Sequence, residues 1–237
     1  MKTIGPTGNL NRAARLVLTA ACLILFSFGN LNAHPLGNFT INHFARLEVG
    51  TDKIKLRYVV DMAEIPTFQE LQSLTTNGGD PPNKNELDAF AARKSARYSD
   101  GLLLVLDGAR LPLRLLASRA VLVTGAGGLQ TLRIESDLAA TIPVATQAVV
   151  RRLRFEDQNY SDRIGWRELV VTPLAGTSLF DCSAYGTNLT DELKAYPSDM
   201  LTAPLDERTA ELSFAGGVVP NGAHALLARD GRPVAAP

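Results

Sequence analysis

The chain has 237 residues, of which 46% are hydrophobic and 20% are charged, and its 24 basic and 24 acidic residues cancel. This balance excludes the strongly basic surface by which proteins bind nucleic acids. A chain of this length can bury enough apolar surface to fold without disulfides.

The first 33 residues have the organisation of a signal peptide. Lys2, Arg12 and Arg15 precede an apolar run over residues 16–28, and Ala33 follows as a small residue suited to a cleavage site. These are the three parts of a secretory signal. The run is shorter than the about 20 residues of a membrane-spanning helix. We expect cleavage after Ala33 and export to the periplasm or another extracytoplasmic space; the alternative is an uncleaved anchor or a buried helix.

Cleavage would remove three basic residues and no acidic ones, which leaves 21 basic against 24 acidic residues, a net charge of −3. Cys182 would then be the only cysteine, so no intramolecular disulfide can form. We expect it to be a buried, small apolar residue rather than a reactive thiol.

The mature chain begins with a predicted β-hairpin. Apolar and polar residues alternate over residues 39–49 and again over 54–60, and a turn over 50–53 separates the two segments. A period of two is typical of half-buried strands. A turn centred on residues 51 and 52 pairs positions whose numbers sum to 103, so that Asn42 opposes Asp61 and Phe39 opposes Glu64. The face that carries His43 is the predicted core face.

Two helices and a series of short strands follow. Residues 65–74 and 86–98 have helical patterns and form an expected helical insertion at about 65–99. Asp107-Gly108 is a strong hairpin signal. Strands are predicted over residues 102–106, 109–115, 121–124, 129–136, 145–155, 166–171 and 211–214, with one helical turn over 190–196.

This order of elements predicts a mainly β fold, an immunoglobulin-like β-sandwich with a short helical insertion. The expected domain spans residues 34–215. Residues 216–237 are rich in Gly, Ala and Pro and are expected to form a flexible tail.

Residues 120–128 resemble the strand and glycine loop of a dinucleotide-binding fold, but Gln130 stands where the third glycine would fall. The alternation over residues 129–136 also predicts a strand where that fold needs a helix. We therefore expect a hairpin turn and no bound nucleotide.

The sequence contains little material for catalysis. Its three histidines are His34, His43 and His224, and no zinc-protease, Cys-x-x-Cys or nucleophile-elbow motif occurs. We expect no enzyme; a hydrolase using carboxylates such as Asp61 and Glu64 is the third alternative. His43 is expected to be a core histidine.

His34 is the candidate metal ligand. If cleavage follows Ala33, its α-amine and imidazole form a chelating pair suited to nickel, cobalt, copper or zinc. The predicted register brings the incoming chain beside Asp61 and Glu64, so either carboxylate is a candidate further ligand. The alternative is a frayed terminus and a carboxylate that caps a helix.

Four stretches carry a resemblance to a known family. They are His34-Pro-Leu-Gly-Asn-Phe-Thr-Ile-Asn-His43, Tyr58-Val-Val-Asp-Met-Ala-Glu-Ile-Pro-Thr-Phe-Gln-Glu70, Gly165-Trp-Arg-Glu168 and Tyr196-Pro-Ser-Asp-Met-Leu-Thr-Ala-Pro-Leu-Asp206. They resemble the extracytoplasmic N-terminal domain of nickel/cobalt (NicO-type) transporter family proteins. The membrane permease part of that family is lacking, so we expect either a truncated product or a domain that acts with a separate permease.

The resemblance implies an exported accessory domain of a nickel/cobalt-type metal-ion transport system, with a membrane permease as its partner. The alternative is an envelope protein-interaction β-sandwich module that binds no metal.

Overall fold

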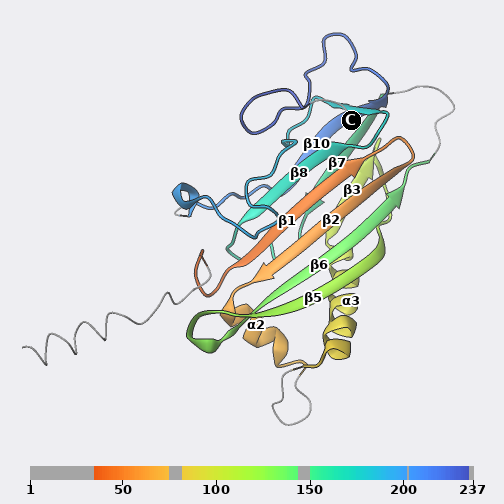
Figure 1. Cartoon of the computed structure of the whole chain (residues 1–237). Helices are drawn as coiled ribbons and strands as arrows, with labels where there is room; N and C mark the ends of the chain where they lie inside the picture. The colour runs from red at the N-terminus through yellow and green to blue at the C-terminus, as the bar shows by residue number, and fades with distance from the viewer. Residues whose placement is uncertain (1–34, 75–81, 144–149, 202, 235–237) are drawn as a thin grey trace, which may run out of the picture. The chain divides into compact units, whose positions relative to one another are not determined.

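The computed structural model describes residues 35–74, 82–143, 150–201 and 203–234. They form two five-stranded sheets (Figure 1). In spatial order, sheet A contains β5 (Arg114–Thr124), β6 (Gln130–Thr141), β2 (Lys53–Met62), β1 (Ile41–Val49) and β8 (Arg167–Pro173). Sheet B contains β4 (Ala109–Arg110), β3 (Leu102–Leu106), β7 (Arg151–Asp157), β10 (Thr209–Gly216) and β9 (Thr177–Phe180). The predicted mainly β sandwich with a short helical insertion is confirmed.

The β1–β2 hairpin has the predicted register. Asn42 is paired with Asp61 and Val49 with Ile54, so the paired positions sum to 103. The ladder continues beyond the strands, because the amide of Ala63 donates to the carbonyl of Thr40 at 3.0 Å. The other neighbour of β1 is β8, which runs parallel to it.

One apolar core fills the space between the sheets. The predicted face of β1 contributes to it together with β2 and β6 of the same sheet, and the strands of sheet B supply the other side. Its fully buried members include Leu47, Leu56, Ile134, Leu153 and Phe155. Burying one such side chain contributes about 1.5–3 kcal/mol.

The helical insertion comprises α2 (Glu64–Leu71) and α3 (Lys84–Asp100). Asn83 and Glu86 form a capping box: each side chain accepts a hydrogen bond from the backbone N–H of the other, at 3.1 and 2.8 Å. Such a box supplies partners for two N–H groups that a helix start leaves unpaired. α3 packs across β5 and β6 and buries Phe90 in the core. Within the described residues, no helix is both long and apolar enough to cross a membrane.

The chain changes sheets after the Asp107-Gly108 turn, so the prediction of one strand over residues 109–115 was wrong. β4 has only two residues, and Pro112 separates it from β5 in sheet A. Proline has no N–H to donate, which ends the ladder there. The predicted glycine turn is confirmed, since the Gly125 amide donates to the Leu129 carbonyl at 2.6 Å between β5 and β6. Part of the strand expected over 145–155 lies outside the described residues.

A second, smaller apolar cluster lies on the other face of sheet A. Residues 185–201 and 203–206, called here the outer layer, cover this face over β1 and β8 (Figure 1). The apolar cluster contains Phe44, Val59, Trp166, Val170 and Leu193. Both faces of β1 are therefore buried.

The expected helical turn over residues 190–196 is a turn of the opposite hand. Asp191, Glu192 and Leu193 have φ of 46°, 58° and 67°, which is the left-handed region. This conformation costs about 1–2 kcal/mol per non-glycine residue. Tertiary contacts hold it in place: Leu193 is buried, and Glu192 pairs with Arg46 at 2.7 Å.

The expected flexible tail makes packed contacts in its described part. Leu226 is buried in the core cluster, and the amide of Val234 donates to its carbonyl at 2.8 Å. Arg229 forms a bidentate ion pair with Glu207, with Nη–Oε distances of 2.9 and 2.7 Å. Packing therefore extends past residue 215, the expected end of the domain.

Candidate functional site

A buried polar cluster connects the two sheets behind β1 and β8. Its members are His43 on β1, Tyr58 on β2, Arg167 on β8 and Asp157 at the end of β7. All four side chains are at most 5% exposed. We call this set the inter-sheet cluster.

Three members of the cluster surround one imidazole nitrogen. His43 Nδ1 lies 2.6 Å from Asp157 Oδ2, 2.8 Å from an Arg167 Nη1 and 3.0 Å from the Tyr58 hydroxyl. A carboxylate only accepts and a guanidinium only donates, so Nδ1 donates to Asp157 in the tautomer that carries a proton there and accepts from Arg167 in the tautomer that does not. Nε2 of His43 is buried and has no hydrogen-bond partner among the described residues.

Arg167 fixes the loop that follows β7. Its Nη2 donates to the carbonyls of Asn159 and Tyr160 at 3.1 and 2.6 Å, and its Nε lies 3.5 Å from Asp206 in the outer layer. One guanidinium thus joins sheet A, the β7 loop and the outer layer. Its planar set of donors suits such a junction better than the single ammonium of lysine.

Three tyrosines and His43 form a closed ring of edge-to-face contacts. The centroid distances are 5.8 Å for His43–Tyr58 and His43–Tyr160, and 5.9 Å for Tyr58–Tyr98 and Tyr98–Tyr160. The Tyr160 hydroxyl donates to Glu70 on α2 at 3.4 Å. The ring therefore links the inter-sheet cluster to the helical insertion.

Burial dominates the electrostatics of the cluster. It lowers the pKa of His43 below its ordinary value, although Asp157 acts to raise it. Burial alone would raise the pKa of Asp157, but the hydrogen bond and charge of His43 bring it below the ordinary value. Burial also raises the pKa of Tyr58 well above its ordinary value and that of Tyr160 to about 12. The tyrosines are therefore neutral at physiological pH and hold the cluster together by hydrogen bonds and ring contacts.

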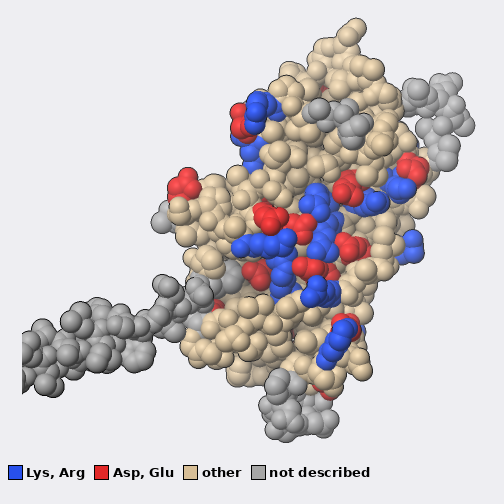
Figure 2. Space-filling model, in the orientation of Figure 1, with Lys and Arg blue, Asp and Glu red and all other residues tan. Residues whose placement is uncertain are grey.

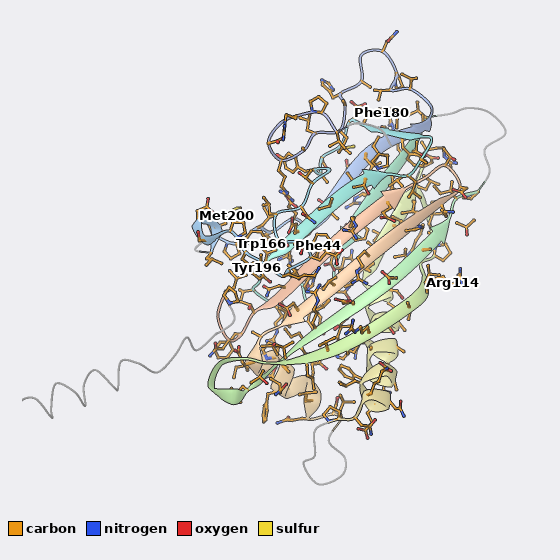
Figure 3. All side chains as sticks on the ribbon, in the orientation of Figure 1. Phe44, Arg114, Trp166, Phe180, Tyr196 and Met200 are labelled. Carbon is orange, nitrogen blue, oxygen red and sulfur yellow. The ribbon has the colours of Figure 1, made fainter. Side chains whose placement is uncertain are left out.

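A second buried carboxylate lies on the opposite face of β8. Glu168 accepts hydrogen bonds from the Leu189 amide, from the Thr190 hydroxyl at 2.5 Å and from the Trp166 indole at 3.4 Å. Trp166 in turn packs against Tyr196 with a centroid distance of 5.6 Å (Figure 3). Arg167 and Glu168 thus anchor β8 on its two faces, one to the β7 loop and the other to the outer layer.

Basic and acidic side chains are interspersed over the exposed part of sheet A (Figure 2). Arg57 lies at its centre and pairs with Glu135 at 2.8 Å, Asp137 at 3.1 Å and Glu192 at 3.5 Å. Exposed ion pairs of this kind contribute about 0–1 kcal/mol each. The charges in this part of the sheet largely satisfy one another.

The structure places the predicted metal ligands as follows. His34 lies outside the described residues. Asp61 is paired with Asn42 on β1 and Arg133 on β6. Glu64 begins α2 and is buried, with its Oε1 so close to Gly125 that a Cβ there would come within 2.7 Å. Within the described ranges, no group of three or more His, Cys, Asp or Glu side chains is arranged to hold a metal ion.

The sequence identified His43 as a core residue but did not identify its partners. Asp157 and Arg167 are separated from it by 114 and 124 positions, and only the fold brings them together. One local signal was present: Arg167 and Glu168 are adjacent charges at the start of an otherwise apolar strand. Cys182 was expected to be buried but is only partly buried against the core, and this burial raises the pKa of its thiol to about 12.

Comparison with known proteins identifies no family. The chain matches no protein-family model, and no curated protein shows significant similarity to it.

Proposed function

We propose that this chain is an exported, non-enzymatic accessory domain of a metal-ion transport system of the nickel/cobalt type, with a membrane permease as its partner. The observation that carries the proposal is the position of the four stretches that resemble NicO-type proteins. They lie between positions 34 and 206 in the sequence, yet their described residues converge around β1 and β8.

Direct contacts join all four stretches. The Trp166 amide donates to the Asn42 side chain at 2.8 Å, which joins the third stretch to the first. Tyr58 in the second stretch contacts His43. The fourth stretch joins through Tyr196, which packs on Trp166. Residues that resemble one family and also form one connected network support a shared fold and a shared role.

Metal binding is the second part of the proposal. The incoming chain runs beside the start of α2, because the Ile65 amide donates to the Asn38 carbonyl at 3.0 Å. This path favours a site in which the amine and imidazole of His34 bind a divalent nickel, cobalt, copper or zinc ion, completed by Glu64 or Asp61. Amine and imidazole nitrogens suit these ions.

The test uses protein exported and processed by a bacterial host. Mass spectrometry should give His34 as the first residue, and calorimetry with each of the four ions should show binding of one ion per chain. His34→Ala should abolish that binding. His224→Ala is the matched control, because its imidazole is 91% exposed and should bind ions only adventitiously. A different first residue, or binding that survives His34→Ala, would contradict the metal site.

The second candidate function is a protein-interaction module of the cell envelope that binds no metal. One specific observation favours it: the free edge of sheet A lies beside an apolar groove.

A further inference from the structure

The outer edge of β5 has unused backbone hydrogen-bonding groups. The Gly125–Leu129 hydrogen bond, together with the β5–β6 register, places Arg119, Val121 and Val123 in the hydrogen-bonded pairs with β6. The N–H and C=O groups of Ser118, Ala120 and Leu122 must then point away from the sheet. None of these groups has a hydrogen-bond partner among the described residues other than those of β6.

A groove runs along this edge. It has a volume of about 1150 Å³ and lies between β5, α2 and α3. Phe68, Leu71 and Leu87 provide apolar walls from the helices, and the consecutive residues 118–122 form the strand side. Phe68 is 58% exposed and contributes apolar surface to this wall. The groove thus combines an apolar wall with a row of free peptide groups.

The unpaired charges beside the groove are basic, because Asp88, the one carboxylate among its described lining residues, is paired with Lys84 at 2.5 Å. Arg114 and Arg119 are exposed on β5, and Figure 3 shows Arg114 at the edge of the sheet. No carboxylate of the described residues lies within 4 Å of either guanidinium, in contrast to the paired charges around Arg57. A second copy of β5 in antiparallel pairing about its centre would bring the two Arg119 side chains together. Like charges in direct opposition are unfavourable, so an acidic partner is favoured over a dimer.

We propose that this edge binds an extended, acidic segment of a partner protein as an additional strand of sheet A. Strand addition beside a helix is a known mode of peptide recognition, in which main-chain hydrogen bonds give affinity and pockets for alternate side chains give specificity. The strand periodicity fixes the pattern of the ligand. Residues on one face enter the groove between Phe68 and Leu87 and are apolar; those on the other face lie beside Arg119 and are acidic.

The first experiment measures peptide binding by fluorescence polarisation. The probe is a labelled nonapeptide of alternating valine and glutamate, blocked at both ends, and the control replaces every glutamate with lysine. We expect the acidic peptide to bind at least about tenfold more tightly than the basic one. Alternate backbone amides of a bound strand point toward β5, and the amides between them point away. N-methylation of two amides that point toward β5 should abolish binding. N-methylation of two amides that point away should leave binding unchanged.

Variants of the full processed chain then test the two halves of the groove. Arg119→Glu should reverse the preference between the acidic and basic peptides. Phe68→Ser should weaken binding of both about tenfold, since it removes the apolar wall. Ile164→Ser is the matched control, because Ile164 is 70% exposed and lies outside the groove. Thermal unfolding should show that all three variants remain folded.

Three results would overturn the proposal: no binding of either peptide at millimolar concentration, equal binding of the two charges, or indifference to the position of N-methylation. A dimer in solution whose β5 amides are protected from hydrogen exchange would also do so, because a second copy would then occupy the edge. None of these outcomes depends on metal binding. The proposal of strand addition at β5 and the proposal of a metal site can therefore be contradicted independently of each other.

Discussion

The two edge strands of sheet A differ in how their outward peptide groups are used. On β8, the amides of Arg167, Leu169 and Val171 donate to Leu205, Glu207 and Tyr185, at 2.7, 3.0 and 3.0 Å. On β5, the corresponding groups of residues 118, 120 and 122 have no such partner among the described residues. One edge is sealed by the chain itself, and the other is open.

Exposed sheet edges promote unwanted pairing, and proteins usually cover or interrupt them. This chain uses some twenty residues, the outer layer, to cover β8, and it does so with a left-handed turn and a buried carboxylate. β5 has a bulge near Leu115 and two arginines, and no strand or loop of the described residues pairs with its outer edge. The segments over residues 165–168 and 203–206 contribute to the sealed edge. The difference suggests that β8 holds the fold together while β5 remains available to a partner.

The largest expected effect comes from Gly165→Ala at the entry to β8. A Cβ at this position would lie 2.0 Å from the backbone carbonyl oxygen of Ile41, which cannot move without breaking the β1–β8 contact. We expect a loss of at least about 4 kcal/mol in the free energy of unfolding, or failure to fold. Urea denaturation measures it. Gly216→Ala is the control, because its φ is not positive and the nearest atom to a Cβ there, in the Thr51 side chain, lies at 3.5 Å, an ordinary van der Waals contact; an equally small effect at Gly165 would contradict the close packing.

The next largest effect is expected from one of two proline substitutions on β5. Val121→Pro removes an N–H that donates to β6 and leaves a carbonyl unpaired, so a loss of about 2–3 kcal/mol is expected. Ser118→Pro removes an outward N–H that has no partner, and we expect about 1 kcal/mol or less, since edge strands tolerate proline. Equal losses in urea denaturation would mean that the assignment of inward and outward groups, and with it the open edge, is wrong.

The sequence predicted those parts of the fold that local pattern determines. The β1–β2 register followed from an alternation of period two and the length of one turn, and the Gly125 turn followed from the strands on either side. The cover of β8 could not be predicted in this way. Its left-handed turn contradicts the local preferences of Asp191, Glu192 and Leu193. The burial of Leu193, the ion pairs of Glu192 and hydrogen bonds to Thr190 maintain it.

In the candidate site, too, the features set by local pattern were predicted and those set by the three-dimensional fold were not. The pairing of Asp61 with Asn42 was predicted correctly because it depends on a single hairpin. The surroundings of Glu64 depend on the β5–β6 turn, some sixty positions later, and hairpin geometry alone contains no information about them. The inter-sheet cluster was missed for the same reason. Buried charges are costly unless they are paired, so Arg167 and Glu168 within a strand indicate distant partners without naming them.

The smallest expected effect is the pH dependence of the free energy of unfolding that comes from His43. Burial lowers the pKa of His43 below that of a histidine in the unfolded chain. At a pH between these two values the unfolded state binds a proton that the folded state does not. The free energy of unfolding should therefore decrease as the pH falls below about 6.5. The lowered pKa of Asp157 acts in the same direction but only below its ordinary value, near 3.8.

Denaturation series between about pH 7.5 and 5 separate this contribution from the others. His43→Gln should be less stable than the parent at neutral pH, because it disrupts the inter-sheet cluster, but its stability should decrease less on acidification. His224→Gln should follow the parent, since its exposed ring faces solvent beside Asp181. A parent chain whose stability is flat over this range would mean that His43 binds its proton equally well in the folded and unfolded states. A stability that increased on acidification would mean that the inter-sheet cluster holds a charged imidazolium beside Asp157 rather than a neutral, buried histidine.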